Sequence, residues 1–310
     1  MVALAVLRAD PLPAILASMR VAILGFGLIG GSIAQALARP KVAQGWSVAA
    51  WTPSGDGPVA ALRDGVVALA ADSPEDALRG ADVVVLAAPP MVCLALLDDL
   101  AGPLRTHVGA DAVITDVAST KSAITLRAAA LGLPFVGGHP MAGREASGYR
   151  AASPELIDGR PWVVVPSVDP RRDARVRALA IACGATPIAM SAAGHDRAVA
   201  AISHLPLVAA AALVESVVGG DGDDVLDPDW PDAARLAGSG WRDMTRLARG
   251  DIAMGTGIAA TNAPALAARV RRYVAVLEAW ASDLEAQGGP DVDAIEGRFR
   301  SARAHLESMP

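Results

Sequence analysis

The stretch GFGLIGG at residues 25–31 constrains the fold of this chain more than any other feature of the sequence. It contains the spacing Gly-x-Gly-x-x-Gly, which by itself is common. Here it follows an apolar run at 21–27 that is typical of a buried strand, and it precedes a helical pattern at 32–38. A glycine-rich turn between a strand and a helix is the context in which this spacing binds a pyrophosphate. The sequence therefore predicts a dinucleotide-binding unit.

Each glycine of this motif has its own predicted role. Gly25 permits a tight turn, Gly27 lets the backbone approach the pyrophosphate, and Gly30 permits close packing of the helix on the strand. The free backbone N–H groups at the start of the helix, around Leu28 and Ile29, would then hold the phosphates.

The residues after the second predicted strand bear on the choice of cofactor. In folds of this kind an acidic residue about 20 positions after the motif holds the ribose of NAD, and an Arg nearby suits NADP. Neither residue type stands here, because Thr52 and Ser54 offer only uncharged hydroxyls. We expect NAD, with contacts from Thr52 and Ser54, and keep NADP as the alternative.

Apolar, β-branched runs alternate with helical patterns over the first 190 residues, as in a doubly wound α/β fold. Runs that are continuously apolar suit a parallel sheet covered on both faces. The predicted strands are 21–27, 46–51, 66–70, 81–89, 111–117, 133–138, 161–166 and 185–190.

The strand signals stop near residue 192, and the remaining segments have helical patterns. Helices are predicted at 195–218, 230–237, 240–248, 262–287 and 292–308. Two of them, 195–218 and 262–287, are apolar around much of their circumference and should be buried. We therefore expect a Rossmann-like domain at 19–191 and an all-helical domain at 192–310 that forms a homodimer.

Composition excludes several other classes of protein. The net charge of −6 and the pI near 5.4 argue against a nucleic-acid partner. Cys93 and Cys183 form no metal-ligand or disulfide pattern, so we expect two buried thiols, no metal and a cytoplasmic location. Residues 1–18 are broken by charges and prolines, which favours a poorly ordered extension over a signal peptide or membrane span.

Two candidate site residues follow predicted strands. His139 stands in GGHP (137–140), either as an incidental imidazole in a turn or as a base held at the carboxyl edge of the sheet. Ser119 in DVASTK (116–121) is either a helix N-cap or a hydroxyl beside that imidazole.

Other candidates lie in the helical half. Arg242 and Arg246 are four residues apart, as on one face of a helix, and form either a surface group or a clamp for a carboxylate. His195 and His204 each stand at a helix start or interruption, where a structural role competes with a catalytic one.

Taken together, these motifs resemble the prephenate/arogenate dehydrogenases of tyrosine biosynthesis. The resemblance covers residues 19–265, and its specific part is HPMAG-x-E-x-SG joined to a later RD-x-TR. It rests on GFGLIGGSIA, DVASTK, GGHPMAGREASG, HD at 195, SHLP at 203 and RDMTR at 242. The family has a dinucleotide-binding domain followed by a helical domain that forms an intertwined homodimer.

The resemblance implies roles for individual residues. His139 would be the catalytic base and Ser119 its partner, and Arg246 would bind a substrate carboxylate. Glu145 and Asp243 would form an ionic network with Arg246. His195 and His204 correspond to two histidines that lie near the substrate in the family.

Two positions depart from the family pattern and put the substrate in doubt. Leu207 stands where the family often has His, and Gly255 stands where it often has Trp. An amino-substituted prephenate is therefore an alternative substrate, and a catalytically dead dinucleotide sensor is a non-enzymatic alternative. A β-hydroxyacid dehydrogenase would need a lysine in the second half, but the last lysine is Lys121.

Overall fold

The computed structural model describes residues 19–40, 42, 45–219 and 227–309. The predicted extension at 1–18 lies outside these residues. Contacts within the chain group the residues up to Ala263 into one compact unit and Pro264–Pro310 into a second.

Six parallel strands form the main sheet of the first unit, in the order β3-β2-β1-β4-β5-β6. This is the strand order of a dinucleotide-binding Rossmann fold, so the predicted fold class is confirmed. The strands of the unit are β1 (Met19–Leu24), β2 (Trp46–Trp51), β3 (Leu69–Ala70), β4 (Val83–Leu86), β5 (Val113–Asp116), β6 (Phe135–Val136), β7 (Gly138–Pro140), β8 (Pro161–Val164) and β9 (Thr186–Ala189).

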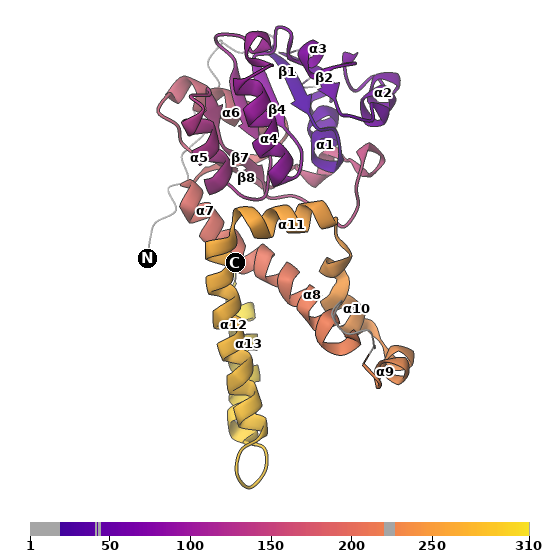
Figure 1. Ribbon diagram of the computed structural model, residues 1–310, viewed down its shortest axis with the longest axis vertical. Coiled ribbons are helices and arrows are strands. Elements are labelled where there is room, and N and C mark those ends of the chain that lie inside the picture. The colour runs from indigo at the N-terminus through magenta and orange to yellow at the C-terminus, as the bar shows by residue number, and fades with distance from the viewer. Residues whose placement is uncertain (1–18, 41, 43–44, 220–226, 310) are drawn as a thin grey trace. The chain divides into compact units, whose positions relative to one another are not determined.

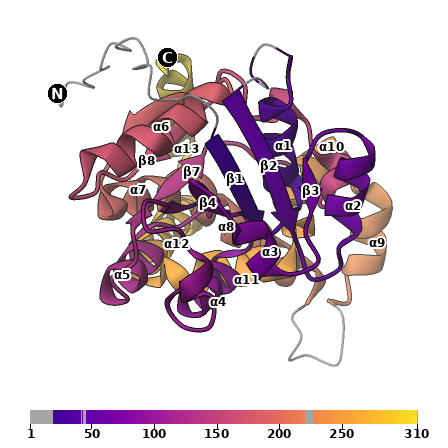
Figure 2. The same ribbon diagram turned by 90° about the horizontal axis from the view of Figure 1, so that it is seen from above.

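Helices cover both faces of this sheet, as Figures 1 and 2 show. Alternate residues of β1 point to opposite faces: Val21 and Ile23 join one buried cluster, and Ala22 and Leu24 join the other. The first cluster receives α1 (Leu28–Leu37), α2 (Asp56–Arg63) and α6 (Pro170–Ala182). The second receives α3 (Pro74–Leu78), α4 (Pro90–Ala101) and α5 (Ser122–Ala130).

The last three strands differ from the predicted single parallel sheet. They form a separate sheet in which β7 pairs antiparallel with β8, and β8 pairs parallel with β9. The predicted strand at 133–138 therefore splits after β6. His139 lies within β7, opposite Val163, instead of in a turn after a strand.

The glycine before His139 is required by close packing. A Cβ at Gly138 would lie 2.7 Å from the backbone oxygen of Asp116 and 2.9 Å from Oγ1 of Thr115, both at the end of β5. Gly138 also donates its backbone N–H to the Asp116 carboxylate at 3.1 Å. The second sheet is thus attached directly at the carboxyl edge of the first.

The helices after β9 deviate from prediction in two places. The segment 195–218 is divided into two helices by a π-helical turn that ends at His204, in agreement with the interruption expected there. Helix α10 ends at Thr245, so Arg246 starts a 3₁₀ turn and the two arginines do not share one α-helical face. Helix α11 was not predicted. The elements are α7 (Ala192–Val199), η5 (Ala200–His204), α8 (Leu205–Val218), α9 (Trp230–Leu236), α10 (Ser239–Thr245), η6 (Arg246–Arg249) and α11 (Ile252–Thr261).

The run Ala192–Val218 has a mean hydropathy of 1.8 and, by length and composition alone, could cross a membrane. Its first turns, however, bury His195 and Asp196 in a polar network beside the sheet. A helix that packs against other parts of a protein would have the same apolar composition as a membrane-spanning helix.

The second unit is a helical hairpin of α12 (Ala263–Leu284) and α13 (Val292–Glu307), close to the predicted bounds. Trp280 and Phe299 pack edge to face with centroids 5.1 Å apart. Arg298 pairs with Asp283 and lies over the Trp280 ring. Asp291 caps α13 by accepting the N–H of Ala294 at 3.0 Å. The short 3₁₀ turns elsewhere are η2 (Arg105–His107), η3 (Tyr149–Ala151) and η4 (Pro154–Leu156).

Candidate active site

The glycine motif lies where the strand order reverses, at the carboxyl end of β1 between β2 and β4. Gly25 has φ +92°, and a Cβ there would lie 2.5 Å from the backbone oxygen of Ala87. A Cβ at Gly30 would lie 2.6 Å from the backbone oxygen of Gly25. Both positions therefore need glycine for the protein's own packing.

Gly27 is different, because a Cβ there would meet no protein atom within 4 Å. Helix α1 begins directly after it at Leu28, and no side chain caps this helix. An open glycine beside uncapped N–H groups fits a bound pyrophosphate. Thr52 and Ser54 follow β2, the neighbouring strand, where the ribose would lie.

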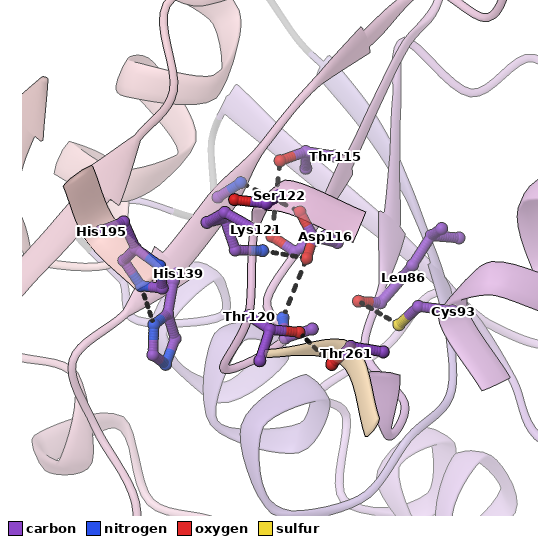
Figure 3. A network of polar contacts seen from close by, with 12 residues as sticks. Leu86, Cys93, Thr115, Asp116, Thr120, Lys121, Ser122, His139, His195 and Thr261 are labelled. Atoms are coloured by element: carbon purple, nitrogen blue, oxygen red, sulfur yellow. Dashed lines mark hydrogen bonds and ion pairs between the residues drawn. The ribbon is translucent and has the colours of Figure 1, made fainter. Parts of the chain in front are cut away.

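A buried ion pair lies under the end of β5. Lys121 donates to the carboxylate of Asp116, and neither side chain is exposed (Figure 3). Burial raises the pKa of Asp116, although Lys121 and the N–H groups of Gly138 and Ala118 lower it in part. Because Asp116 also binds Gly138, this pair fixes β7 and therefore the backbone of His139.

His139 is the start of a buried chain of polar groups (Figure 3). Its Nδ1 lies 2.8 Å from Nε2 of His195, and Nδ1 of His195 lies 2.8 Å from Oδ1 of Asp196. The Asp196 carboxylate also accepts the backbone N–H groups of Lys121 at 2.8 Å and Ser122 at 2.7 Å, at the start of α5. Among the described residues, no hydrogen bond occupies Nε2 of His139.

Burial sets the charge of this imidazole. It holds the pKa of His139 well below the ordinary value of 6.5, and the positive charge of Lys121 lowers it further. His139 is therefore neutral at physiological pH, and a neutral ring can accept a proton.

His204 ends the π-turn, and its side chain is buried. Asn262 donates Nδ2 to the backbone oxygen of Asp196 at 2.9 Å and lies 3.1 Å from Nδ1 of His204. Nε2 of His204 has no hydrogen-bond partner among the described residues. Burial lowers the pKa of His204 to about 4, so its ring is neutral at physiological pH. With the Asn262 amide donating to Nδ1, the hydrogen of the ring is on Nε2.

Ser119 lies half-buried in the loop between β5 and α5, and its backbone approaches His204. It is not the N-cap of α5, because that position is Lys121. Its hydroxyl makes no hydrogen bond among the described residues, and His139 Nδ1 bonds to His195 instead.

The predicted ionic network is present in part. Arg246 pairs with Glu145, which follows β7 in the loop beyond His139. Asp243 and Arg242 are exposed and form no ion pair within the described part of the chain. Arg246 itself is 57% exposed, so its guanidinium could exchange Glu145 for a ligand carboxylate.

The two departures from the family pattern lie next to each other. A Cβ at Gly255 would lie 3.8 Å from Cδ2 of Leu207. One small and one apolar residue therefore replace two polar or aromatic side chains at a single place on α8 and α11.

Sequence reasoning gave no role to several residues of this site. Asp116, Lys121, Asp196 and Asn262 hold the histidines in place, and their partners lie up to 75 positions away in the chain. The one available signal was charge at the buried end of a strand, since Asp116 closes β5 and needs a partner.

A hollow of about 470 Å³ lies between the loop at 141–144 and residues 153–160, and none of the candidate histidines lines it. No group of three or more metal-ligating side chains occurs among the described residues.

Both parts of the chain match known protein families. Residues 46–188 match the nucleotide-binding domain of prephenate dehydrogenase, and residues 191–294 match the dimerization domain of prephenate dehydrogenase. The chain is 31% identical to the prephenate dehydrogenase of Bacillus subtilis, over 92% of this chain and 75% of that protein.

Solved structures share the fold. The arogenate dehydrogenase of Synechocystis is 31% identical, with a TM-score of 0.72 over 93% of this chain and all of that one. The prephenate dehydrogenase of A. aeolicus, solved with hydroxyphenyl propionate and NAD⁺, is 24% identical, with a TM-score of 0.81 over 94% of this chain and 99% of that one. The two matched domains and the Bacillus relative make this chain a member of the prephenate dehydrogenase family.

Proposed function

We propose that this protein oxidises and decarboxylates prephenate, with NAD as hydride acceptor, to give 4-hydroxyphenylpyruvate. Family membership supports the reaction class. The observation that carries the proposal is His139, a buried imidazole kept neutral, with Nδ1 bound to His195 and Nε2 left without a partner among the described residues.

The first unit would hold the cofactor. Gly27 and the uncapped start of α1 would contact the pyrophosphate, and Thr52 and Ser54 would contact the ribose. A bound nicotinamide supplies the hydride acceptor. The absence of a charged residue at 51–54 favours NAD with weak discrimination against NADP.

The chain's own residues move the proton. Nε2 of His139 takes the proton of the substrate's C4 hydroxyl as the C4–H bond gives up its hydride. The C4–O bond becomes a carbonyl, and the ring carboxylate at C1 then leaves as carbon dioxide. The electron pair of that C–C bond enters the ring, which becomes aromatic, and the oxygen takes back a proton. Proton transfer to a positioned base contributes about 10²–10⁴ in rate.

Charged and polar groups of the helical segments would bind the substrate's two carboxylates. Arg246 would bind one of them in exchange for Glu145. The unpartnered Nε2–H of His204 would donate a second hydrogen bond, which would satisfy a buried donor.

The pair Leu207 and Gly255 supports activity on arogenate as well. An apolar residue in place of a histidine removes a cation that could contact the substrate side chain. That loss should penalise prephenate, whose side chain is an anionic keto acid, more than arogenate, whose ammonium offsets its carboxylate. We therefore include arogenate as a substrate.

The dimerization domain supports a homodimer. Cys93 and Cys183 are buried free thiols, and a protein with free thiols and no disulfide among its described residues suits the reducing cytoplasm, which supports a cytoplasmic location.

The test is NAD(P)H absorbance at 340 nm with prephenate, arogenate and an amino-substituted prephenate, each with NAD and NADP. His139→Asn should lower kcat by about 10²–10⁴ and leave NAD binding intact. His107→Asn, an exposed histidine in η2, is the matched control. Absence of turnover with all three substrates, or near-normal kcat in His139→Asn, would refute the proposal.

A further inference from the structure

The chain of hydrogen bonds behind His139 ends on a carboxylate, and when the His195 ring between them is neutral this carboxylate fixes the direction of every bond in the chain. An ionised carboxylate only accepts hydrogen bonds. Nδ1 of His195 must therefore carry the hydrogen shared with Asp196. In neutral His195 the other nitrogen, Nε2, is then an acceptor, so the hydrogen between the two rings belongs to Nδ1 of His139.

We propose that Asp196 is a positioning residue that acts through His195 to hold His139 in the tautomer with the hydrogen on Nδ1. In that tautomer Nε2 of His139 carries a lone pair, as a base requires. The opposite tautomer would present an N–H to the substrate hydroxyl and could not take its proton. In this inference His195 supports the base, His139, and does not bind the substrate as the family resemblance implies. Both ring nitrogens of His195 are already bonded to protein groups.

Asp196 is held in the ionised state that this role needs. Burial opposes ionisation, but hydrogen bonds from His195, from Ser122 and from the backbone of Lys121 outweigh it and lower the pKa of Asp196 to about 2. Two of the donors are backbone N–H groups at the start of α5, where the helix dipole also favours a negative charge. Asn262 fixes the backbone of Asp196 from α11's end.

The same carboxylate balances the charge that develops during the reaction. The ionisable groups that act on His139 are Lys121, His195, His204 and Asp196. Of these, Asp196 favours the protonated ring and the other three oppose it. Lys121 thus keeps His139 neutral before the reaction, and Asp196 stabilises the imidazolium after proton transfer.

Asp196→Asn tests this role directly. An asparagine retains an oxygen for the N–H of Ser122, and its NH₂ group, in place of Oδ1, can donate to Nδ1 of His195 but no longer accepts the N–H of Lys121. The hydrogens in the chain then reverse, and Nε2 of His139 acquires the hydrogen. We expect kcat to fall by about 10²–10⁴ with KM nearly unchanged, and the acidic limb of the pH profile to be lost. Ser191→Ala is the matched control, because the Ser191 hydroxyl caps the same helix, α7, by accepting the N–H of Gly194 and bonds to neither histidine. The bond that does link Ser191 to His195, from the His195 N–H to the Ser191 carbonyl, is a backbone bond that alanine keeps. It should lower Tm and leave kcat and the pH profile unchanged.

The tautomer can be measured without turnover, by ¹⁵N NMR of histidine-labelled protein, with the His139→Asn spectrum for assignment. The kinetic measurements of Asp196→Asn rest on the proposed function, whereas the NMR measurement does not. We expect a non-protonated Nε2 in the wild-type His139 and a protonated one in Asp196→Asn. A protonated Nε2 in the wild type would overturn the inference even if Asp196→Asn failed to fold. Wild-type kcat and pH profile in a folded Asp196→Asn protein would overturn it equally.

Discussion

The environment of His139 makes a pH prediction that differs from the ordinary behaviour of histidine. Burial and Lys121 hold its pKa well below 6.5. Because only the neutral ring accepts a proton, kcat/KM should stay constant through pH 6.5 and begin to fall well below it. Initial rates with prephenate and NAD between about pH 5 and 8 measure this. Circular dichroism at each pH separates titration from unfolding, and an acidic limb centred at or above 6.5 would contradict the prediction.

Arg246 carries the second prediction for a single residue. If its guanidinium binds a substrate carboxylate, Arg246→Ala should raise KM by about 10- to 100-fold, less than a fully buried pair would because the side chain is half exposed. Its kcat should change much less, and NAD affinity should not change. Arg242→Ala removes the same charge from an exposed position on α10 and should have no effect. Equal KM values for the two variants would make Arg246 a surface residue.

At the scale of elements, local pattern located most strands but not the sheet that each strand joins. Apolar runs look alike in both sheets, and the split between β6 and β7 depends on how Gly138 packs against β5. Helix α11 was not predicted because its glycines disfavour a helix. At Gly257 the glycine is explained by tertiary packing, since a Cβ there would lie 3.0 Å from Cδ of Pro90 in α4. The pairing of His195 with His139 across 56 positions likewise lies beyond any local pattern.

The turn between β1 and α1 gives a prediction in which two glycines of one motif behave differently. Gly27→Val should fold normally, because no protein atom lies within 4 Å of its Cβ position, and should lose dinucleotide binding. Gly30→Ala should lower Tm, because its Cβ would lie 2.6 Å from a backbone oxygen. Gly240→Ala, at another open glycine, is the control for both. Calorimetric titration with NAD and thermal melts measure the two effects, and wild-type NAD affinity in Gly27→Val would contradict the assignment.

At the scale of the whole molecule, the apolar surface of the helical segments calls for a partner. Four apolar residues on α12, Tyr273, Val274, Val276 and Leu277, are each 38–48% exposed, and they recur at the spacing of one helix face. The 192–218 run is also apolar, only a minority of its residues are buried, and it lies inside the matched dimerization domain. A second copy of this chain would bury such surfaces without requiring a lipid bilayer.

A dimer of this kind should be visible in solution. Sedimentation equilibrium of the wild-type protein should give twice the chain mass of 31.5 kDa. Leu277→Asp places a charge on the exposed α12 face and should shift the equilibrium toward monomer, because burying an unpaired carboxylate costs several kcal/mol. Leu126→Asp makes the same change on α5, where the side chain is 73% exposed and lies outside the dimerization domain, and it should leave the mass unchanged. A monomeric wild type, or a dimer that tolerates Leu277→Asp as readily as Leu126→Asp, would show that this helix face does not carry the interface.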